Sequence, residues 1–261
     1  MTTKTEYAPG TPSWVDLGTT DTAAAQAFYG PLFGWEFEAQ HQDPDGQVVY
    51  CLAKLGGRNA AGIMEQPPGQ RDMGVPPSWN SYVSVTDADA ATAKVEGAGG
   101  TVFMPAMDVM DAGRMSVFAD PTGAVIGTWQ PKNHIGAEIV NEPGALTWNE
   151  LISPDVDKAA AFYAQVFGWK HRTQEMGPMT YTEFLLDDQS IAGAMPPPME
   201  GIPPMWGVYF AVSDCDATVA DAKSRGASVI AEPVDIPPGR FAVLADPQGA
   251  VFSVIKSNPG G

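Results

Sequence analysis

The 261-residue chain is poor in basic residues, cysteine and long apolar runs, and each shortage excludes a class of function. It has 14 Lys and Arg against 31 Asp and Glu, a formal net charge of −17, which disfavours nucleic acid and anionic membranes as partners. Its two cysteines have no CxxC spacing, which excludes a disulfide framework or a structural zinc site. No run approaches the roughly 18 apolar residues of a membrane-spanning helix, and residues 1–10 lack the apolar stretch of a signal peptide. We therefore expect a cytoplasmic globular protein.

Motifs of several common enzyme classes are also absent. There is no GxxxxGK[ST], no GxGxxG after a strand, no GxSxG and no HExxH. Cys51 and Cys215 lie outside recognisable nucleophile contexts, so we expect both to be structural.

The chain instead contains one pattern written twice. Three segments return 134 residues later (148 − 14): WVDL at Trp14 as WNEL at Trp148, AFY at Ala27 and Ala161, and LFGW at Leu32 as VFGW at Val166. PPxW at 76–79 returns at 203–206, and ADPxGA at 119–124 returns at 245–250. Small changes of offset are what loop deletions produce between collinear copies. We therefore expect two modules, at residues 10–131 and 144–256, joined by a linker at 132–143.

Each copy predicts the same order of elements. In the first copy these are a strand (13–18), a helix (21–33), two strands (48–54, 59–64), a Pro/Gly/Met-rich loop (66–77), a strand (81–85), a helix opened by Asp87 and three strands (101–104, 115–118, 124–129). In the second copy we expect Ser153 to cap the first helix, because proline follows it. Each copy therefore contains two half-units of the βαβββ type, in an α+β fold.

This order, with D…FY…LFGW in the helix and a terminal DPxG turn, resembles the vicinal oxygen chelate superfamily, which includes glyoxalase I, bleomycin-resistance proteins and extradiol dioxygenases. The chain is similar in particular to two-module glyoxalase-like proteins of actinobacteria that are often labelled hydroxylases. The resemblance covers nearly the whole chain. It implies that paired βαβββ units curl into cup-shaped, incomplete barrels, and that each cup holds the ligand.

The resemblance also implies a divalent metal in the cup, held by His, Gln or Glu at three strand positions. These positions map to Trp14, Asn80 and Gly127 in the first module and to Trp148, Gly207 and Ser253 in the second. None is a histidine or a carboxylate, the usual ligands of such a cation. The three histidines, at positions 41, 134 and 171, do not complete a set. We therefore expect no metal and no other cofactor, with a divalent metal as the alternative.

The opening strands place a carboxylate beside an indole. The two-residue period of a strand sends Trp14 and Asp16 to one face, and Trp148 and Glu150 likewise. The tryptophans either fill space where the metal would lie or form the aromatic wall of a pocket. The carboxylates either bond to a neighbouring strand or, with a pKa raised by burial, act as acid and base.

Other side chains are further candidates for ligand binding. Trp79 and Trp206 follow Pro-Pro pairs and either anchor those loops or line the pocket, with Tyr82 and Tyr209 on the strands that follow. We interpret the two Met- and Pro-rich loops as adaptable lids over a hydrophobic ligand.

Two arginines are repeated as well. Arg114 follows Asp108 across a turn, and Arg240 follows Asp235 in the same way. Each arginine either forms a salt bridge that fixes its turn or binds an anionic group of the ligand.

Three functions remain open at this point. The first is a binding protein that holds a small hydrophobic or aromatic molecule in a Trp-lined cup. The second is a cofactor-independent isomerase or lyase that uses Asp16 or Glu150 as acid and base. The third is a metal-dependent glyoxalase, hydroxylase or dioxygenase. A monomer and a homodimer are both compatible with four half-units.

Overall fold

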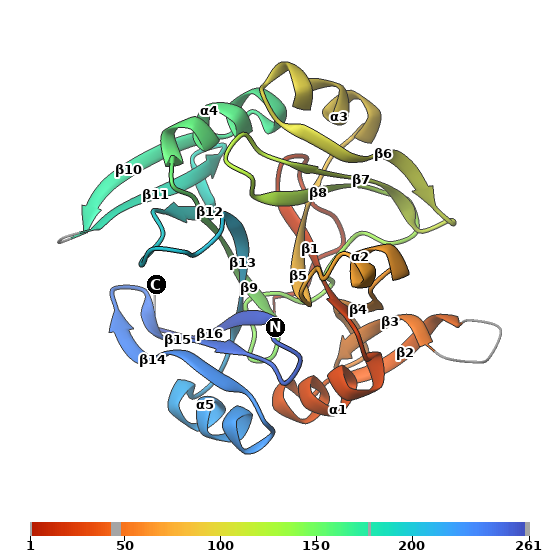
Figure 1. Ribbon diagram of the computed structural model, residues 1–261, viewed down its shortest axis with the longest axis vertical. Helices are drawn as coiled ribbons and strands as arrows, with labels where there is room; N and C mark the ends of the chain where they lie inside the picture. The colour runs from red at the N-terminus through yellow and green to blue at the C-terminus, as the bar shows by residue number, and fades with distance from the viewer. Residues whose placement is uncertain (1, 43–47, 177–178, 259–261) are drawn as a thin grey trace.

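The strands form two eight-stranded sheets, one for each copy of the repeat (Figure 1). The computed structural model describes residues 2–42, 48–176 and 179–258. The first copy comprises β1 (Pro12–Thr19), α1 (Thr22–Phe33), β2 (Glu36–Gln42), β3 (Val48–Leu55), β4 (Arg58–Glu65), α2 (Pro68–Asp72), β5 (Ser78–Ser84), α3 (Ala88–Gly97), β6 (Thr101–Val109), β7 (Gly113–Ala119) and β8 (Val125–Pro131). The second comprises β9 (Leu146–Ile152), α4 (Val156–Phe167), β10 (Lys170–Met176), β11 (Met179–Leu186), β12 (Gln189–Met195), β13 (Met205–Ala211), α5 (Cys215–Ser224), β14 (Ser228–Ile236), β15 (Gly239–Ala245) and β16 (Val251–Ser257).

The pairing of the strands confirms the expected βαβββ half-units. The first sheet has the order β2-β3-β4-β1-β5-β8-β7-β6, and the second repeats it as β10-β11-β12-β9-β13-β16-β15-β14. In each half-unit the first strand pairs in parallel with the fourth, and the two half-units join through the antiparallel pairs β1–β5 and β9–β13. The outermost strands of a sheet do not pair with each other, so each sheet is an open cup.

Three details of the sequence-based prediction were wrong, the first being that residues 66–77, expected as a loop, contain the short helix α2. The second copy's helix α4 is capped by Asp155 rather than Ser153, because the Asp155 carboxylate accepts the backbone N–H of Lys158 at 3.0 Å. The prediction also missed β2 and β10, each of which lies at one edge of its sheet. Their sequences, EFEAQHQ and KHRTQEM, are mostly polar and lack the apolar pattern from which the other strands were predicted.

The two modules pack against each other through two apolar clusters. The faces of β1 and β5 that point away from the cup pack, together with α1, against β13 and β16 of the second module, in a cluster that includes Leu17, Phe33, Phe210 and Phe252. As a result the four half-units form a ring, in which α1 lies beside α5 and α3 lies beside α4 (Figure 1).

Hydrogen bonds cross between the modules at equivalent places. The Tyr29 hydroxyl of α1 donates to Asp246 of the second DPxG turn at 3.1 Å. The Tyr163 hydroxyl of α4 donates to Asp120 of the first DPxG turn at 3.0 Å. The repeated FY and DPxG motifs therefore meet as partners across the interface between modules. None of the described helices is long and apolar enough to cross a membrane.

Candidate functional site

The concave face of the first sheet carries a buried carboxylate. The register sets Asp16 of β1 opposite Asn80 of β5, and Trp14 opposite Tyr82. The Asp16 Oδ1 atom accepts a hydrogen bond from Asn80 Nδ2 at 2.9 Å and from the Tyr82 hydroxyl at 3.3 Å. The structure thus brings these four candidate side chains together.

A tyrosine from β3 completes this cup. Trp14 Nε1 donates to the Tyr50 hydroxyl at 3.2 Å, and the tyrosine ring lies against Gly62 of β4. A Cβ atom on Gly62 would lie 2.3 Å from that hydroxyl oxygen, so only glycine leaves room for the ring.

The second cup is built in the same way, with Glu150 in the place of Asp16. Glu150 of β9 accepts from the Tyr181 hydroxyl at 2.8 Å through Oε2 and from the Tyr209 hydroxyl at 2.9 Å through Oε1. Trp148 Nε1 donates to the Tyr181 hydroxyl at 3.1 Å. A Cβ atom on Gly193 would lie 2.0 Å from that same oxygen, as at Gly62 in the first cup.

Burial sets the electrostatics of both carboxylates. Desolvation raises the pKa of Asp16 to about 6, although the hydrogen bonds from Asn80 and Tyr82 favour the ionised form and oppose that rise. Desolvation likewise raises the pKa of Glu150, opposed by the bonds from Tyr181 and Tyr209. Asp16 therefore changes its protonation close to neutral pH, which suits proton transfer.

The sequence-based analysis missed Tyr50 and Tyr181. Each is separated from its counterpart in the other copy by 131 residues (181 − 50), and Gly62 and Gly193 have the same offset. This shared offset was the available signal, because it places a tyrosine and a glycine on neighbouring strands of both cups.

Trp79 and Trp206 lie away from the carboxylates. Both are buried in the core on the opposite face of their strands, 5% and 3% exposed. Trp79 Nε1 donates to Tyr29 at 3.1 Å and Trp206 Nε1 donates to Tyr163 at 2.8 Å. The structure therefore does not bring these two tryptophans into the candidate site.

The arginines also lie outside the cups. Besides the expected aspartates, each arginine has a second aspartate partner that the sequence-based prediction did not include. Arg114 forms a bidentate pair with Asp89 of α3, at 2.7 and 2.9 Å, while Asp108 is 3.5 Å away. Arg240 pairs in the same way with Asp216 of α5, at 2.7 and 2.8 Å, and also contacts Asp235. Each arginine ties a strand to a helix, which accounts for its repetition without a ligand.

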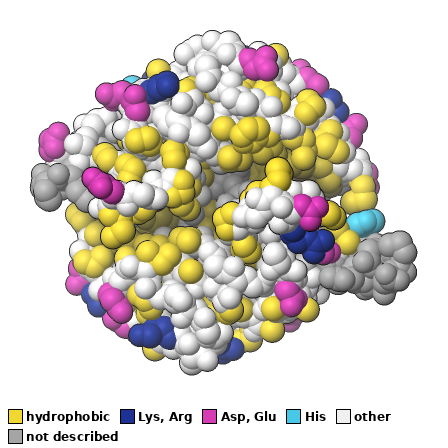
Figure 2. All heavy atoms as spheres, viewed as in Figure 1, with side chains coloured by type: hydrophobic (Ala, Val, Ile, Leu, Met, Phe, Trp, Pro, Cys, Tyr) yellow, Lys and Arg dark blue, Asp and Glu magenta, His cyan; other side chains and the backbone are white. Residues whose placement is uncertain are grey.

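The loops predicted as lids carry exposed methionines. Met73 follows the short helix α2 and is 75% exposed, and Met199, between β12 and β13, is 67% exposed. Figure 2 shows hydrophobic side chains gathered around a hollow near the middle of this face.

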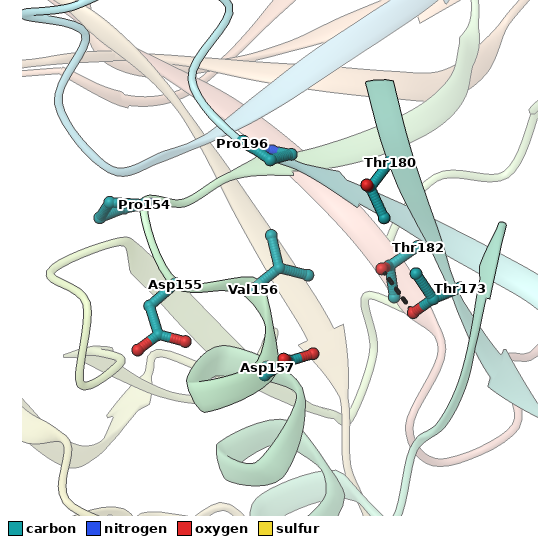
Figure 3. A pocket seen from close by; sticks show the side chains of 8 residues that line it. All are labelled: Pro154, Asp155, Val156, Asp157, Thr173, Thr180, Thr182 and Pro196. Atoms are coloured by element: carbon teal, nitrogen blue, oxygen red, sulfur yellow. Dashed lines mark hydrogen bonds between the residues drawn. The ribbon is translucent and has the colours of Figure 1, made fainter. Parts of the chain in front are cut away.

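A separate surface hollow of about 230 Å³ lies beside the start of α4 (Figure 3). Its lining includes Thr180 and Thr182, which flank Tyr181 in β11. Because alternate residues of a strand face opposite sides, this hollow lies on the other side of the strand from Glu150. The Asp155 carboxylate at its edge already caps the helix. The hollow therefore does not belong to the candidate site.

The side chains in the cups do not provide the metal ligands of the family that the sequence resembles. The described residues contain no group of three or more His, Cys, Asp or Glu side chains that could hold an ion. Each cup presents one carboxylate that already accepts hydrogen bonds. A Cβ atom on Gly127, the mapped third position, would lie 2.3 Å from the Tyr82 ring, so this cup has no space for a third ligand side chain there. That the protein works without a metal remains a prediction.

Comparison with known proteins identifies the family to which the chain is similar. A model of the Glyoxalase/Bleomycin resistance protein/Dioxygenase superfamily matches residues 11–128 and 135–254. The chain is 51% identical, over 99% of both chains, to a Mycobacterium tuberculosis protein provisionally named glyoxylase CFP32. It is 40% identical to the anthracycline biosynthesis protein DnrV of Streptomyces peucetius, over 98% of this chain and 96% of that one.

Solved structures share the fold at low sequence identity. The Mn(II)-bound glyoxalase from Novosphingobium aromaticivorans has a TM-score of 0.65 and 17% identity, covering 95% of this chain and 82% of the other. The 2,3-dioxygenase LapB from Pseudomonas sp. KL28 has a TM-score of 0.64 and 15% identity, covering 95% and 92%. With two modules matched across most of its length, the chain belongs to the Glyoxalase/Bleomycin resistance protein/Dioxygenase superfamily.

Proposed function

We propose that the protein binds a small hydrophobic or aromatic molecule in the second cup, with Trp148 as the aromatic wall and Glu150 as the polar contact. One observation carries this proposal: of the seven tryptophans, six are at most 5% exposed, and Trp148 alone is partly open to solvent. A partly open indole beside a buried carboxylate has the composition of a ligand pocket, which is mostly apolar with a few placed polar groups.

The chemistry of the cup favours a flat molecule that carries a hydroxyl group. Tyr181 and Tyr209 each donate to a different oxygen of Glu150. Because a carboxylate oxygen has two acceptor sites, each can accept a further bond from a ligand hydroxyl. Two Streptomyces relatives are named as anthracycline biosynthesis proteins. An aromatic alcohol would stack on Trp148 and donate to Glu150.

Calorimetry with neutral aromatic alcohols of one to four rings, 1-naphthol first, tests the proposal. A hydrogen bond to a charged group contributes about 1.5–3 kcal/mol, so Glu150→Gln should weaken binding about tenfold or more. Trp148→Ala should also weaken it, whereas 1-methoxynaphthalene, which has no hydroxyl donor, should bind equally to the parent chain and to Glu150→Gln.

Asp16→Asn is the matched control, because it changes the equivalent carboxylate in the other cup. Its affinity for 1-naphthol should equal that of the parent chain. The proposal fails if no alcohol of the panel shows saturable binding, or if Glu150→Gln and Trp148→Ala bind as the parent does.

A second candidate is a cofactor-independent isomerase or lyase that would take its substrate beside Asp16 in the first cup, and it therefore requires that cup to be open to small molecules. Burial raises the pKa of this carboxyl to about 6, so that it can both accept and return a proton near neutral pH. Incubation of aromatic ketones in D₂O with EDTA should then lead to deuterium at the carbon next to the carbonyl group. Asp16→Asn should abolish that exchange, and exchange that survives the substitution would remove Asp16 from this role.

A further inference from the structure

The two cups differ most at the end where the first tryptophan lies. There the segment that connects β8 to β9, called the linker below, enters the first cup: Ala137 and Val140 pack in one buried cluster with Trp14, Tyr82 and Trp129. Ala137 is fully buried and Trp14 is only 3% exposed. The apolar wall of this cup is therefore already covered by the chain itself.

Hydrogen bonds hold the linker in this position. Trp129 Nε1 donates to the His134 carbonyl oxygen at 2.7 Å, and the His134 ring lies edge-on to Trp14 with centroids 4.4 Å apart. The Ala137 N–H donates to the Ser13 carbonyl oxygen at 2.8 Å. These contacts join the linker both to β8 and to the start of β1.

The N-terminal segment lies over the linker and fastens it further. The Tyr7 hydroxyl donates to the Ala137 carbonyl oxygen at 2.7 Å. Thr3 forms an antiparallel bridge with Ile139. The linker is thus held between the cup and a second segment of chain.

The second cup has no equivalent cover among the described residues. Ile255 stands where Trp129 stands in the first copy, 126 residues later (255 − 129), so the anchoring indole N–H is missing. Residues 256–258, which follow, are exposed. Trp148 remains partly open, whereas its counterpart Trp14 is covered.

We propose that linker residues 134–140 are an internal ligand of the first cup, so that the protein has one small-molecule site rather than two. The stoichiometry rests on the proposed function of the second cup; the covering of the first does not. A tethered segment is always present at high effective concentration, so a free molecule competes poorly for the surface that the segment covers.

The linker can be displaced without touching the wall of the cup. Gly136 has a φ of +107°, and a Cβ atom there would lie 2.4 Å from the Ser13 carbonyl oxygen. Gly136→Val should therefore push the linker away from β1 and uncover Trp14. Val140→Ala, which only shortens a side chain of the linker, is a second and milder variant. Asn133→Ala, at an exposed linker position, is the matched control.

The test uses protein labelled with 5-fluorotryptophan, whose ¹⁹F signals are assigned with single Trp→Phe variants. The neutral nitroxide TEMPOL is then added, because this paramagnetic probe broadens the signals of the tryptophans that it can approach. In the parent chain the Trp148 signal should broaden and the Trp14 signal should not. Gly136→Val or Val140→Ala should make the Trp14 signal broaden as well, and Asn133→Ala should not. Equal broadening of Trp14 and Trp148 in the parent, or protection of Trp14 in both displacing variants, overturns the proposal.

Calorimetry with 1-naphthol separates this inference from the proposed function. We expect one equivalent bound by the parent chain and a second, weaker equivalent bound by Gly136→Val. Two equivalents bound by the parent would refute the internal ligand while leaving the second cup as a site. If 1-naphthol and the other alcohols do not bind, the proposed function fails, and the nitroxide experiment still decides whether the linker covers Trp14.

Discussion

Replacing Asp16 by asparagine should stabilise the chain at neutral pH. The carboxyl has a pKa of about 6 when folded, against an ordinary value of 3.8, because burial penalises its ionised form. That difference corresponds to about 3 kcal/mol of unfavourable ionisation in the folded state. Asparagine does not ionise, and its side-chain oxygen can still accept the bond from Tyr82.

The sign of the pH dependence follows from proton binding. Between about pH 4 and pH 6 the folded chain holds a proton on Asp16 more tightly than the unfolded chain does, so the free energy of unfolding falls as pH rises. The favourable contribution is complete below the unfolded pKa and is lost above the folded one. Asp16→Asn escapes this loss, so its advantage over the parent should grow by about 3 kcal/mol from about pH 4 to about pH 8.

Urea unfolding of both proteins across this range, followed by tryptophan fluorescence, measures the difference directly. Asp89→Asn provides a control of opposite sign, because the hydrogen bonds from Arg114 lower the pKa of Asp89. That variant should be less stable than the parent by an amount that is nearly constant over this range, because the favourable contribution of a lowered pKa is already complete above the unfolded value of 3.8. A difference between Asp16→Asn and the parent that does not change with pH would show that Asp16 does not titrate as its burial requires.

Two further substitutions test the packing and the contact between modules. Gly193→Ala should cost about 1–3 kcal/mol of unfolding free energy, because its Cβ atom would displace the Tyr181 hydroxyl from Glu150; unchanged urea stability would contradict this close contact. Tyr163→Phe removes the bond that Tyr163 donates to Asp120 across the module interface and the bond that it accepts from Trp206. It should lower stability by about 1–3 kcal/mol, seen as a lower midpoint of thermal unfolding. An unchanged midpoint would mean that the crossed bond adds nothing to stability.

The fold could be predicted well from the sequence because the internal repeat shows which segments form equivalent strands and helices. Segments that recur at matched offsets show which strands and helices are equivalent, and the glycine after each first helix marks where it ends: Gly34 and Gly168 both adopt positive φ, +72° and +77°. The edge strands β2 and β10 escaped prediction because their side chains are polar and do not show a buried face.

The site was predictable only in part. Alternation along β1 and β9 correctly placed Trp14 with Asp16, but it said nothing about which other strands reach them. Tyr50 lies on β3, and its position against the cup depends on how far the sheet curls, which a local pattern does not contain. For Trp79 the sequence left two interpretations open, a loop anchor or a pocket wall. Because it precedes Asn80 in β5, it faces the opposite side of the strand and lies in the core.

The crossed bonds between the modules have a consequence for a chain of half this length. A single module would carry both the tyrosine of its first helix and the aspartate of its last turn, yet these two groups bond between modules and not within one. It could make both bonds only with a second copy of itself, related by a two-fold axis. The present chain therefore holds the symmetry of a homodimer in one polypeptide. The segment that connects the two halves has no counterpart in such a dimer, and it is the segment that packs into the first cup.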